Sequence, residues 1–315
     1  MIEKFKALLE KHDKVSIITH RNPDGDTLGT GLGIYSLLKK IGKQVEICNI
    51  DKELPKSLDF LPHFAKIKSQ INFDNSLIIT CDSGSIDLLG FDLSLREIVN
   101  IDHHQSNTNY GALNIVDSKC VSASMVAYKL LKDDFEMTKD MATCFYVALV
   151  TDTQNFITLN VNKDVLSVAS ELISFGINLV EVNKNLTQRK SLSSLRVLSA
   201  TLDTLELYED AQIASMVVSQ DILGKTGARL NDTIGLVDYG IALVTVKIAI
   251  LVIEFSDHLK VSFRSDAADV SSLAVHFGGG GHLMASGFRS EELDIELVLK
   301  QIKKEIKQRG LINGS

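Results

Sequence analysis

The segment Lys14-Val-Ser-Ile-Ile-Thr-His20-Arg-Asn-Pro-Asp24-Gly-Asp26 decides how the first part of this chain can fold. Its opening run is apolar enough to form a strand buried on both faces of a sheet. A Pro-Asp-Gly turn follows at once, and a helical pattern over residues 27–41 follows the turn. A strand, a tight turn and a helix in this order indicate a βαβ unit, and therefore a mainly parallel sheet.

The same alternation of strands and helices continues to about residue 185. Further strands are predicted over residues 44–49, 77–81, 97–101 and 113–116, and further helices over 122–132, 139–150 and 165–175. Beyond a helical segment, strands are predicted over 213–218, 249–255 and 259–264, and a last helix over 294–308. We therefore expect an α/β chain with a mainly parallel-sheet domain over 1–186, a helical linker over 187–206 and a smaller α/β domain over 207–315.

Composition limits the classes of protein that this chain can be. The 315 residues are 45% hydrophobic and 23% charged, and the formal charge of −7 disfavours a protein that coats long duplex nucleic acid. The first residues form an amphipathic helix rather than a secretory signal, and the longest apolar stretch, 241–255, is too short to span a bilayer. Four cysteines without a Cys-x-x-Cys pair fit reduced thiols. We expect a cytoplasmic enzyme without membrane association.

Acidic and histidine side chains follow three of the predicted strands, at the edge where open α/β sheets form binding crevices. Carboxylates and imidazoles together suit Mn, Fe, Co or Zn better than Ca, which prefers oxygen ligands. Four acidic groups gathered without a cation would repel one another, whereas two divalent cations would balance them. For Asp24 and Asp26 alone, turn and helix-cap chemistry is an equal alternative. The candidate donors are His20, Asp24, Asp26, Asp82, Asp102, His103, His104 and Asp152.

With these residues in view, the chain resembles the DHH phosphoesterase superfamily over nearly its whole length. The motifs occur in the family's order, and the later part of the chain is similar to the family's DHHA1 module. The segments that carry the resemblance are His20…Asp24-Gly-Asp26…Gly29, Asp82-Ser83, Asp102-His103-His104, Thr151-Asp152-Thr153, Phe263-Arg264-Ser265 and Gly278-Gly-Gly-Gly-His282.

The resemblance implies a role for each motif residue of the first domain. One Mn²⁺ would be held by His20, Asp24 and Asp82, and a second by Asp26, Asp82, His103 and Asp152, so that Asp82 bridges the two ions. His104 would face the scissile phosphate, and Asp102 would orient it or act as a distal ligand. In one departure, Gln154-Asn155-Phe156 follows Thr153, where relatives commonly have Gly before the aromatic residue. That departure adds bulk near the site without removing a predicted ligand.

The second domain is expected to bind substrate. Backbone amides exposed by glycines can cradle a phosphate, and an arginine can bind one through two parallel hydrogen bonds. Considered alone, the glycine run is better explained as a flexible turn, and the resemblance favours a role in gripping a second phosphate or a terminal nucleotide. The role of His276 stays open. The expected substrate-binding residues are Arg264, Ser265, Gly279, Gly280, Gly281 and His282.

The chain looks most like the family's stand-alone nano-RNases, which also dephosphorylate 3′-phosphoadenosine 5′-phosphate (pAp). The resemblance thus implies a Mn²⁺-dependent hydrolase that degrades di- to pentaribonucleotides from an end and converts pAp to AMP. Hydrolysis of cyclic di-AMP or pApA is the first alternative, and an inorganic pyrophosphatase is a weaker one. A non-catalytic nucleotide-binding regulator is the alternative from another class. The oligomeric state stays open, with a homodimer as one candidate.

Overall fold

The computed structural model describes residues 1–312, which divide into a first compact unit, Met1–Arg189, and a second that begins at Lys190. Each unit is built around its own six-stranded sheet. The expected α/β class and the mainly parallel first sheet are confirmed. The domain limits expected at residues 186 and 206 stay a prediction.

The first unit holds sheet A, in which every pairing is parallel. The strand order β3-β2-β1-β4-β5-β6 means that the chain moves to one side of β1 and then starts again on its other side at β4. This reversal is the point at which open α/β sheets bind ligands. The strands are β1 (Lys14–Thr19), β2 (Gln44–Cys48), β3 (Ile67–Lys68), β4 (Leu77–Cys81), β5 (Ile98–Asp102) and β6 (Leu113–Val116).

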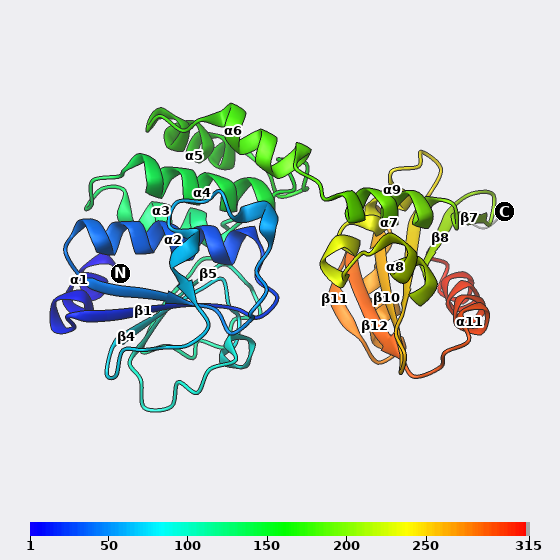
Figure 1. Ribbon diagram of the computed structural model, residues 1–315, viewed down its shortest axis with the longest axis horizontal. Helices are drawn as coiled ribbons and strands as arrows, with labels where there is room; N and C mark the ends of the chain where they lie inside the picture. Colours follow the sequence, from blue (N-terminus) through cyan, green and yellow to red (C-terminus); the bar gives the residue numbers. More distant parts are fainter. Residues whose placement is uncertain (313–315) are drawn as a thin grey trace. The chain divides into compact units, whose positions relative to one another are not determined.

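Helices pack on one face of sheet A and on one another (Figure 1). Glycines allow α2 and α4 to approach closely, because a Cβ on Gly29 would lie 2.6 Å from the Cys144 carbonyl oxygen and one on Gly33 would overlap the Phe145 ring. The helices of this unit are α1 (Ile2–Lys11), α2 (Gly25–Lys40), α3 (Ala123–Leu131), α4 (Lys139–Asp152), α5 (Lys163–Ser174) and α6 (Leu179–Asn183), the last continued by a π-helical turn at Lys184–Gln188.

The opposite face of sheet A carries a smaller apolar cluster that includes Ile18, Cys48 and Ile78. Irregular segments and 3₁₀ turns cover it, among them the turn Ile86–Leu89 that follows β4. The remaining 3₁₀ turns of this unit are Lys56–Leu58 and Phe64–Lys66.

The second unit is built on sheet B, whose strand order is β11-β12-β10-β9-β8-β7 and in which only β8 and β9 pair in parallel. Helices α10 and α11 pack on one face, and α7, α8 and α9 pack on the other. The strands are β7 (Glu206–Tyr208), β8 (Ile213–Val218), β9 (Ile248–Glu254), β10 (Leu259–Ser265), β11 (Gly280–His282) and β12 (Ala285–Ser290). The helices are α7 (Leu192–Leu202), α8 (Gln220–Thr226), α9 (Leu236–Ile241), α10 (Val270–His276) and α11 (Ile295–Gln308), with a 3₁₀ turn at Leu230–Thr233.

Two local predictions differ from the structure. The helix expected over 187–206 is confined to Leu192–Leu202, because the Ser191 side chain caps its first turn and β7 already begins at Glu206. Part of the glycine run is not a loop, since Gly280–His282 forms the edge strand β11.

Within residues 1–312, no single helix is long and apolar enough to cross a membrane. By length and composition, only Lys163–Ser174 and Leu179–Gln188 together reach that threshold, and the pair is bent by 120°.

Candidate metal centre

The register of sheet A places the motif residues side by side at the carboxyl ends of three neighbouring strands. Thr19 of β1 pairs with Cys81 of β4, and Cys81 in turn pairs with Ile101 of β5. The residues that follow these positions are His20, Asp82 and Asp102. The strand reversal between β1 and β4 thus brings together side chains that are far apart in the sequence.

The turn after β1 holds two carboxylates. Asp24 is the N-cap of α2, and its Oδ1 accepts hydrogen bonds from the backbone N–H groups of Asp26 and Thr27 at 3.0 and 3.1 Å. The His20 Nδ1–H donates to the Arg21 carbonyl at 2.8 Å, which leaves Nε2 facing Asp24 at 3.8 Å. Helix capping and approach to His20 are therefore compatible roles for Asp24.

Asp26 is fully buried and is held from the opposite side of the site. Its carboxylate accepts backbone N–H groups of Ala123 and Ser124, at 2.6 and 3.1 Å, and the Thr30 hydroxyl at 3.0 Å. These donors begin α3 and lie within α2, so two helices fix the carboxylate. Its Oδ2 still lies 3.8 Å from Nε2 of His103.

Asp82 lies at the centre of the arrangement. Its Oδ2 is 3.4 Å from Nε2 of His20, and its Oδ1 is 3.3 Å from Nε2 of His103. The residue is only 4% exposed, and within the described chain Oδ1 has no hydrogen-bond partner. Its backbone adopts φ +57°, a left-handed conformation that is uncommon outside glycine and turns a side chain sharply. The His103 ring is the nearest partner of Oδ1 but is not placed for a well-formed hydrogen bond, and a cation between the carboxylate and the histidines would satisfy it.

Asp152 completes the arrangement from the last turn of α4, with Oδ2 3.7 Å from Nε2 of His103. Among the described residues, three sets of donor atoms are close enough together to hold a metal ion. They are His20, Asp24 and Asp82; Asp26, His103 and Asp152; and Asp82, His103 and His104. Two of these sets share Asp82, and two share His103.

The histidines of the donor cluster do not supply enough positive charge to balance its carboxylates. Burial raises the pKa of Asp26 well above its usual range and that of Asp152 to about 6. Burial opposes charging of the histidines, but the neighbouring carboxylates outweigh it and raise the pKa of His20 to about 9 and of His103 to about 10. For Asp82, burial is outweighed by His103 and His20, which lower its pKa. Some of these histidines and carboxylates therefore bind protons. The same groups are suitable ligands for divalent cations, which would displace those protons.

His104 is oriented by a buried network of polar side chains. Its Nδ1 lies 2.7 Å from Oδ1 of Asp102, and Oδ2 of Asp102 accepts a hydrogen bond from the Asn107 amide. The same amide donates to Oδ1 of Asn100 at 2.7 Å, and Asn100 donates to the Tyr110 hydroxyl at 2.9 Å. Both carboxylate oxygens of Asp102 are therefore engaged, and Asp102 belongs to none of the three donor sets. The arrangement favours the orienting role over the distal-ligand role.

Sequence reasoning missed Asn107, Asn100 and Tyr110. Asn107 follows the histidine pair by only a few residues, but asparagine in a loop is ordinarily a turn residue. Asn100 is hidden in the apolar pattern of β5, in which every residue is buried. Proximity of Asn107 to the motif was the only available signal.

The departure after Thr153 produces an unusual backbone. Gln154, Asn155 and Phe156 all have positive φ, at 48°, 62° and 65°. The Thr153 hydroxyl accepts the Phe156 N–H at 3.2 Å, and the Phe156 ring lies 6.5 Å from that of Tyr146. A glycine at position 154 would adopt this conformation with less strain.

The residues expected to bind substrate in the second unit have different environments. The Arg264 side chain is 31% exposed, with Nε 3.1 Å from Oδ1 of Asp238. The buried Ser265 hydroxyl donates to the Lys247 carbonyl at 2.7 Å and accepts the Ala268 N–H at 2.8 Å, so it stabilises the end of β10.

The glycine run combines tight packing with an exposed edge. A Cβ on Gly279 would lie 2.2 Å from the Gly287 carbonyl oxygen, whereas a Cβ on Gly280 would meet nothing within 4 Å. Gly281 has φ +143° and accepts the Ser271 hydroxyl at 2.9 Å. Gly280, Gly281 and His282 are exposed in β11, which pairs only with β12. This edge leaves backbone groups of β11 accessible.

Two family models and several known proteins match this chain. Residues 14–149 match the model of the DHH family N-terminal domain, and residues 212–308 match the DHHA1 domain. A bifunctional oligoribonuclease and PAP phosphatase NrnA of Thermus thermophilus is 29% identical over 95% of this chain and 92% of its own. The Bacillus subtilis protein of that name is 26% identical over 88% of this chain and 89% of its own. An exopolyphosphatase-related protein of Bacteroides fragilis superposes with a TM-score of 0.89 at 26% identity, covering 98% of this chain and 96% of that one.

The family match, on a chain of the α/β class with this donor cluster, identifies a phosphoesterase. The chain belongs to the DHH family and carries a DHHA1 domain in its second unit, which confirms the family expected from the motifs.

Metal binding to the cluster should release protons and tighten as the pH rises. The metal-free cluster holds protons on His20 and His103, whose pKa values are about 9 and 10, and partly on Asp152, whose pKa is about 6. Each proton that a cation displaces strengthens apparent affinity by up to about tenfold per pH unit. Calorimetric titration with Mn²⁺ between pH 6 and 9 (roughly the range of these groups), in buffers of different ionisation enthalpy, measures both effects. Affinity independent of pH would contradict this assignment.

Asn107→Ala should lower phosphoesterase turnover by about tenfold without loss of bound metal, because it frees one oxygen of Asp102 and loosens His104. The proton-coupled ¹⁵N shifts of the His104 ring should change with it. Thr108→Ala is the matched control, since its hydroxyl donates only to the Gly84 carbonyl. A reduced metal content in Asn107→Ala would instead place Asn107 in support of the ions.

Proposed function

We propose that this chain is a two-metal phosphoesterase, with Mn²⁺ as its working ion, that hydrolyses short oligoribonucleotides and pAp. The observation that carries the proposal is the position of Asp82, whose two carboxylate oxygens face two different histidines in a buried site. A carboxylate in this position is placed to bridge a pair of cations. Two-metal sites of this kind serve phosphoryl transfer to water.

In this proposal, one ion would be held by His20, Asp24 and Asp82, and these residues form one of the three donor sets. The other ion would be held by Asp26, Asp82, His103 and Asp152, of which Asp26, His103 and Asp152 form a second set. The two divalent ions, when bound, supply Lewis acidity and lower the pKa of an attacking water. The fit is supported by the unpartnered Oδ1 of Asp82 and by the raised pKa values of Asp26 and Asp152.

The role of His104 is to contact the substrate, not to stabilise the fold. Asp102 engages Nδ1 of His104 and raises the pKa of the ring, and the protonated ring can donate a hydrogen bond from Nε2 to a phosphoryl oxygen. Asp102 is a positioning residue, since it is wholly buried and both of its oxygens are already bonded. A donor fixed in advance stabilises developing negative charge without reorganising during the reaction.

The substrate class follows from the relatives and from the second unit. The Thermus and Bacillus relatives are named oligoribonuclease and PAP phosphatase, and both match along most of their length. Arg264 is partly exposed, and the edge strand β11 offers backbone amides, so a phosphate can be bound there. Gly279 packs closely against Gly287, and the Ser265 hydroxyl donates to the Lys247 carbonyl. Both residues therefore stabilise this surface from within the unit.

The test is a substrate panel with Mn²⁺: pAp, di- to pentaribonucleotides, cyclic di-AMP, pApA and pyrophosphate. We expect pAp and the short ribonucleotides to be hydrolysed fastest and chelation to abolish turnover. Asp82→Asn should retain the fold and lose more than about a hundredfold of activity, because both ions share that residue. Asp87→Asn is the matched control, an exposed carboxylate in the turn that follows β4.

Two results would overturn the proposal. Turnover in excess chelator, with no metal bound, would remove the two-metal mechanism. Faster hydrolysis of cyclic di-AMP or pyrophosphate than of pAp and the ribonucleotides would replace the substrate class.

Arg264→Ala should weaken nucleotide binding much more than metal binding, because it removes a charge-assisted phosphate contact from the second unit. Such a contact is worth about 1.5–3 kcal/mol, or roughly a ten- to hundredfold loss of affinity. Hydrolysis of bis-p-nitrophenyl phosphate should change much less. Arg289→Ala is the control. Arg289 lies on the same sheet as Arg264 but forms an ion pair with the exposed Asp257. Equal losses on both substrates would contradict this role.

A further inference from the structure

A cavity of about 440 Å³ lies in the first unit, and none of the residues that line it belongs to the donor cluster described above. Two segments form its walls, one after β3 and one between the Ile86–Leu89 turn and β5, and Ile50 after β2 completes the lining. Ile71 and Phe91 line it and pack on the apolar face of sheet A that the helices do not cover. Its volume is within the range of small-molecule sites.

The wall after β3 is built on a buried charge. Glu46 is 2% exposed, and its carboxylate accepts the backbone N–H groups of Asn72 and Phe73 at 3.0 and 2.9 Å and the Ser16 hydroxyl at 2.8 Å. Lys68 pairs with it at 3.2 Å. A buried carboxylate with these partners holds the segment in one conformation, so the cavity is pre-formed.

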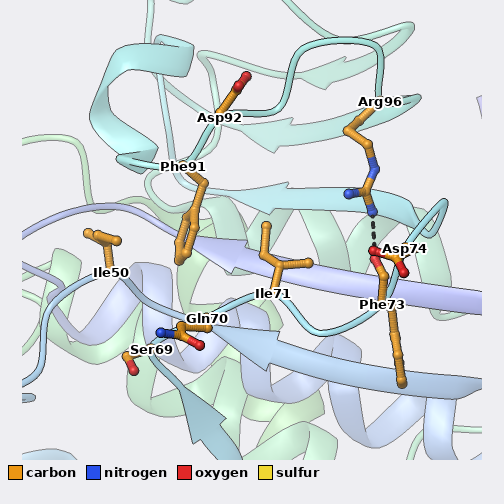
Figure 2. A pocket seen from close by; sticks show the side chains of 9 residues that line it. All are labelled: Ile50, Ser69, Gln70, Ile71, Phe73, Asp74, Phe91, Asp92 and Arg96. Carbon is orange, nitrogen blue, oxygen red and sulfur yellow. Dashed lines mark hydrogen bonds between the residues drawn. The ribbon is translucent and has the colours of Figure 1, made fainter.

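Arg96 joins the two walls. Its Nη2 donates to the carbonyl oxygens of Phe73 and Ser76 at 3.1 and 3.2 Å. Its Nε is buried and has no hydrogen-bond partner among the described residues. The guanidinium lines the cavity, where Phe91 and Arg96 come from one wall and Ile71 and Gln70 from the other (Figure 2).

The lining has the chemistry that binds a nucleobase. The Phe91 ring and the side chains of Ile71 and Ile50 offer apolar surface for a flat heterocycle. The Gln70 amide and the Arg96 guanidinium offer polar groups for its edge. Stacking on an aromatic ring combined with hydrogen bonds to the base edge is how proteins bind single-stranded RNA.

The cavity begins next to the chain that carries His20. Ile50 follows Asn49, whose side-chain amide donates to the His20 carbonyl at 2.8 Å. The Arg21 side chain lies against Gly90. A Cβ added to Gly90 would be 2.4 Å from Nε of Arg21 and 2.9 Å from Cγ2 of Ile50. Within the described chain, the exposed Arg21 guanidinium makes no hydrogen bond or ion pair. A cation here suits a phosphate that links the cavity to the metal centre.

We infer that this cavity is an accessory subsite for a nucleobase of an oligoribonucleotide, at a position beyond the scissile phosphate, with Arg21 on a connecting phosphate. The inference rests on the proposed function, because it assigns part of the same substrate. It implies that substrates long enough to reach the cavity gain affinity from it, whereas pAp does not.

The test compares a pentaribonucleotide with pAp. Phe91→Leu keeps apolar volume but removes the flat ring, and Gln70→Ala removes the exposed amide. In each variant the KM for the pentaribonucleotide should rise, by about tenfold for Phe91→Leu, while the KM for pAp stays near that of the wild type. Gln44→Ala, an exposed amide at the start of β2, is the matched control.

A binding measurement separates this inference from the proposed function. Fluorescence anisotropy of a labelled pentaribonucleotide, recorded in chelator, should show the same loss of affinity in Phe91→Leu and requires no turnover. If the wild-type protein hydrolyses no nucleotide but the anisotropy effect appears, the proposed function fails and the subsite stands. Equal effects on pAp and pentaribonucleotide, no effect on either, or a loss confined to a free mononucleotide would overturn the subsite.

Discussion

The candidate metal centre depends on one carboxylate, whose two oxygens face two different histidines. Asp82 is buried, its oxygens face His20 and His103, and one of them lacks a donor among the described residues. Burial, and after it the repulsion of neighbouring carboxylates, raises the pKa values of Asp26 and Asp152. Burying these carboxylates together costs free energy, and divalent cations would offset that cost.

Topology produces this convergence. The strand order of sheet A reverses between β1 and β4, and the residues after these strands are His20 and Asp82. The glycines of α2 allow α4 to pack closely, and this packing places Asp152, the last residue of α4, within reach of His103. The fold therefore brings candidate donors from a strand end and from a helix end close together.

The strands and the candidate donors could be predicted because they follow local rules. Apolar runs marked β1 and β4, and polar residues at their ends marked the binding edge of the sheet. Asn107 could not be predicted, since its contact with Asp102 depends on the path of a loop. Nor could Glu46, because an acidic residue within a strand pattern ordinarily faces solvent, whereas here backbone amides of a distant segment surround it. Strand β11 was missed because glycines disfavour strands, and only pairing with β12 stabilises it.

The central claim is that Asp82 is shared by two ions, and the electron paramagnetic resonance spectrum of the Mn²⁺-loaded protein tests it most directly. Two Mn²⁺ ions bridged by one carboxylate give an exchange-coupled spectrum, which differs from the six-line pattern of isolated ions. The account predicts two bound ions per chain with a coupled spectrum, and loss of the coupling in Asp82→Asn. A single ion, or two ions with uncoupled spectra in the wild-type protein, would contradict it.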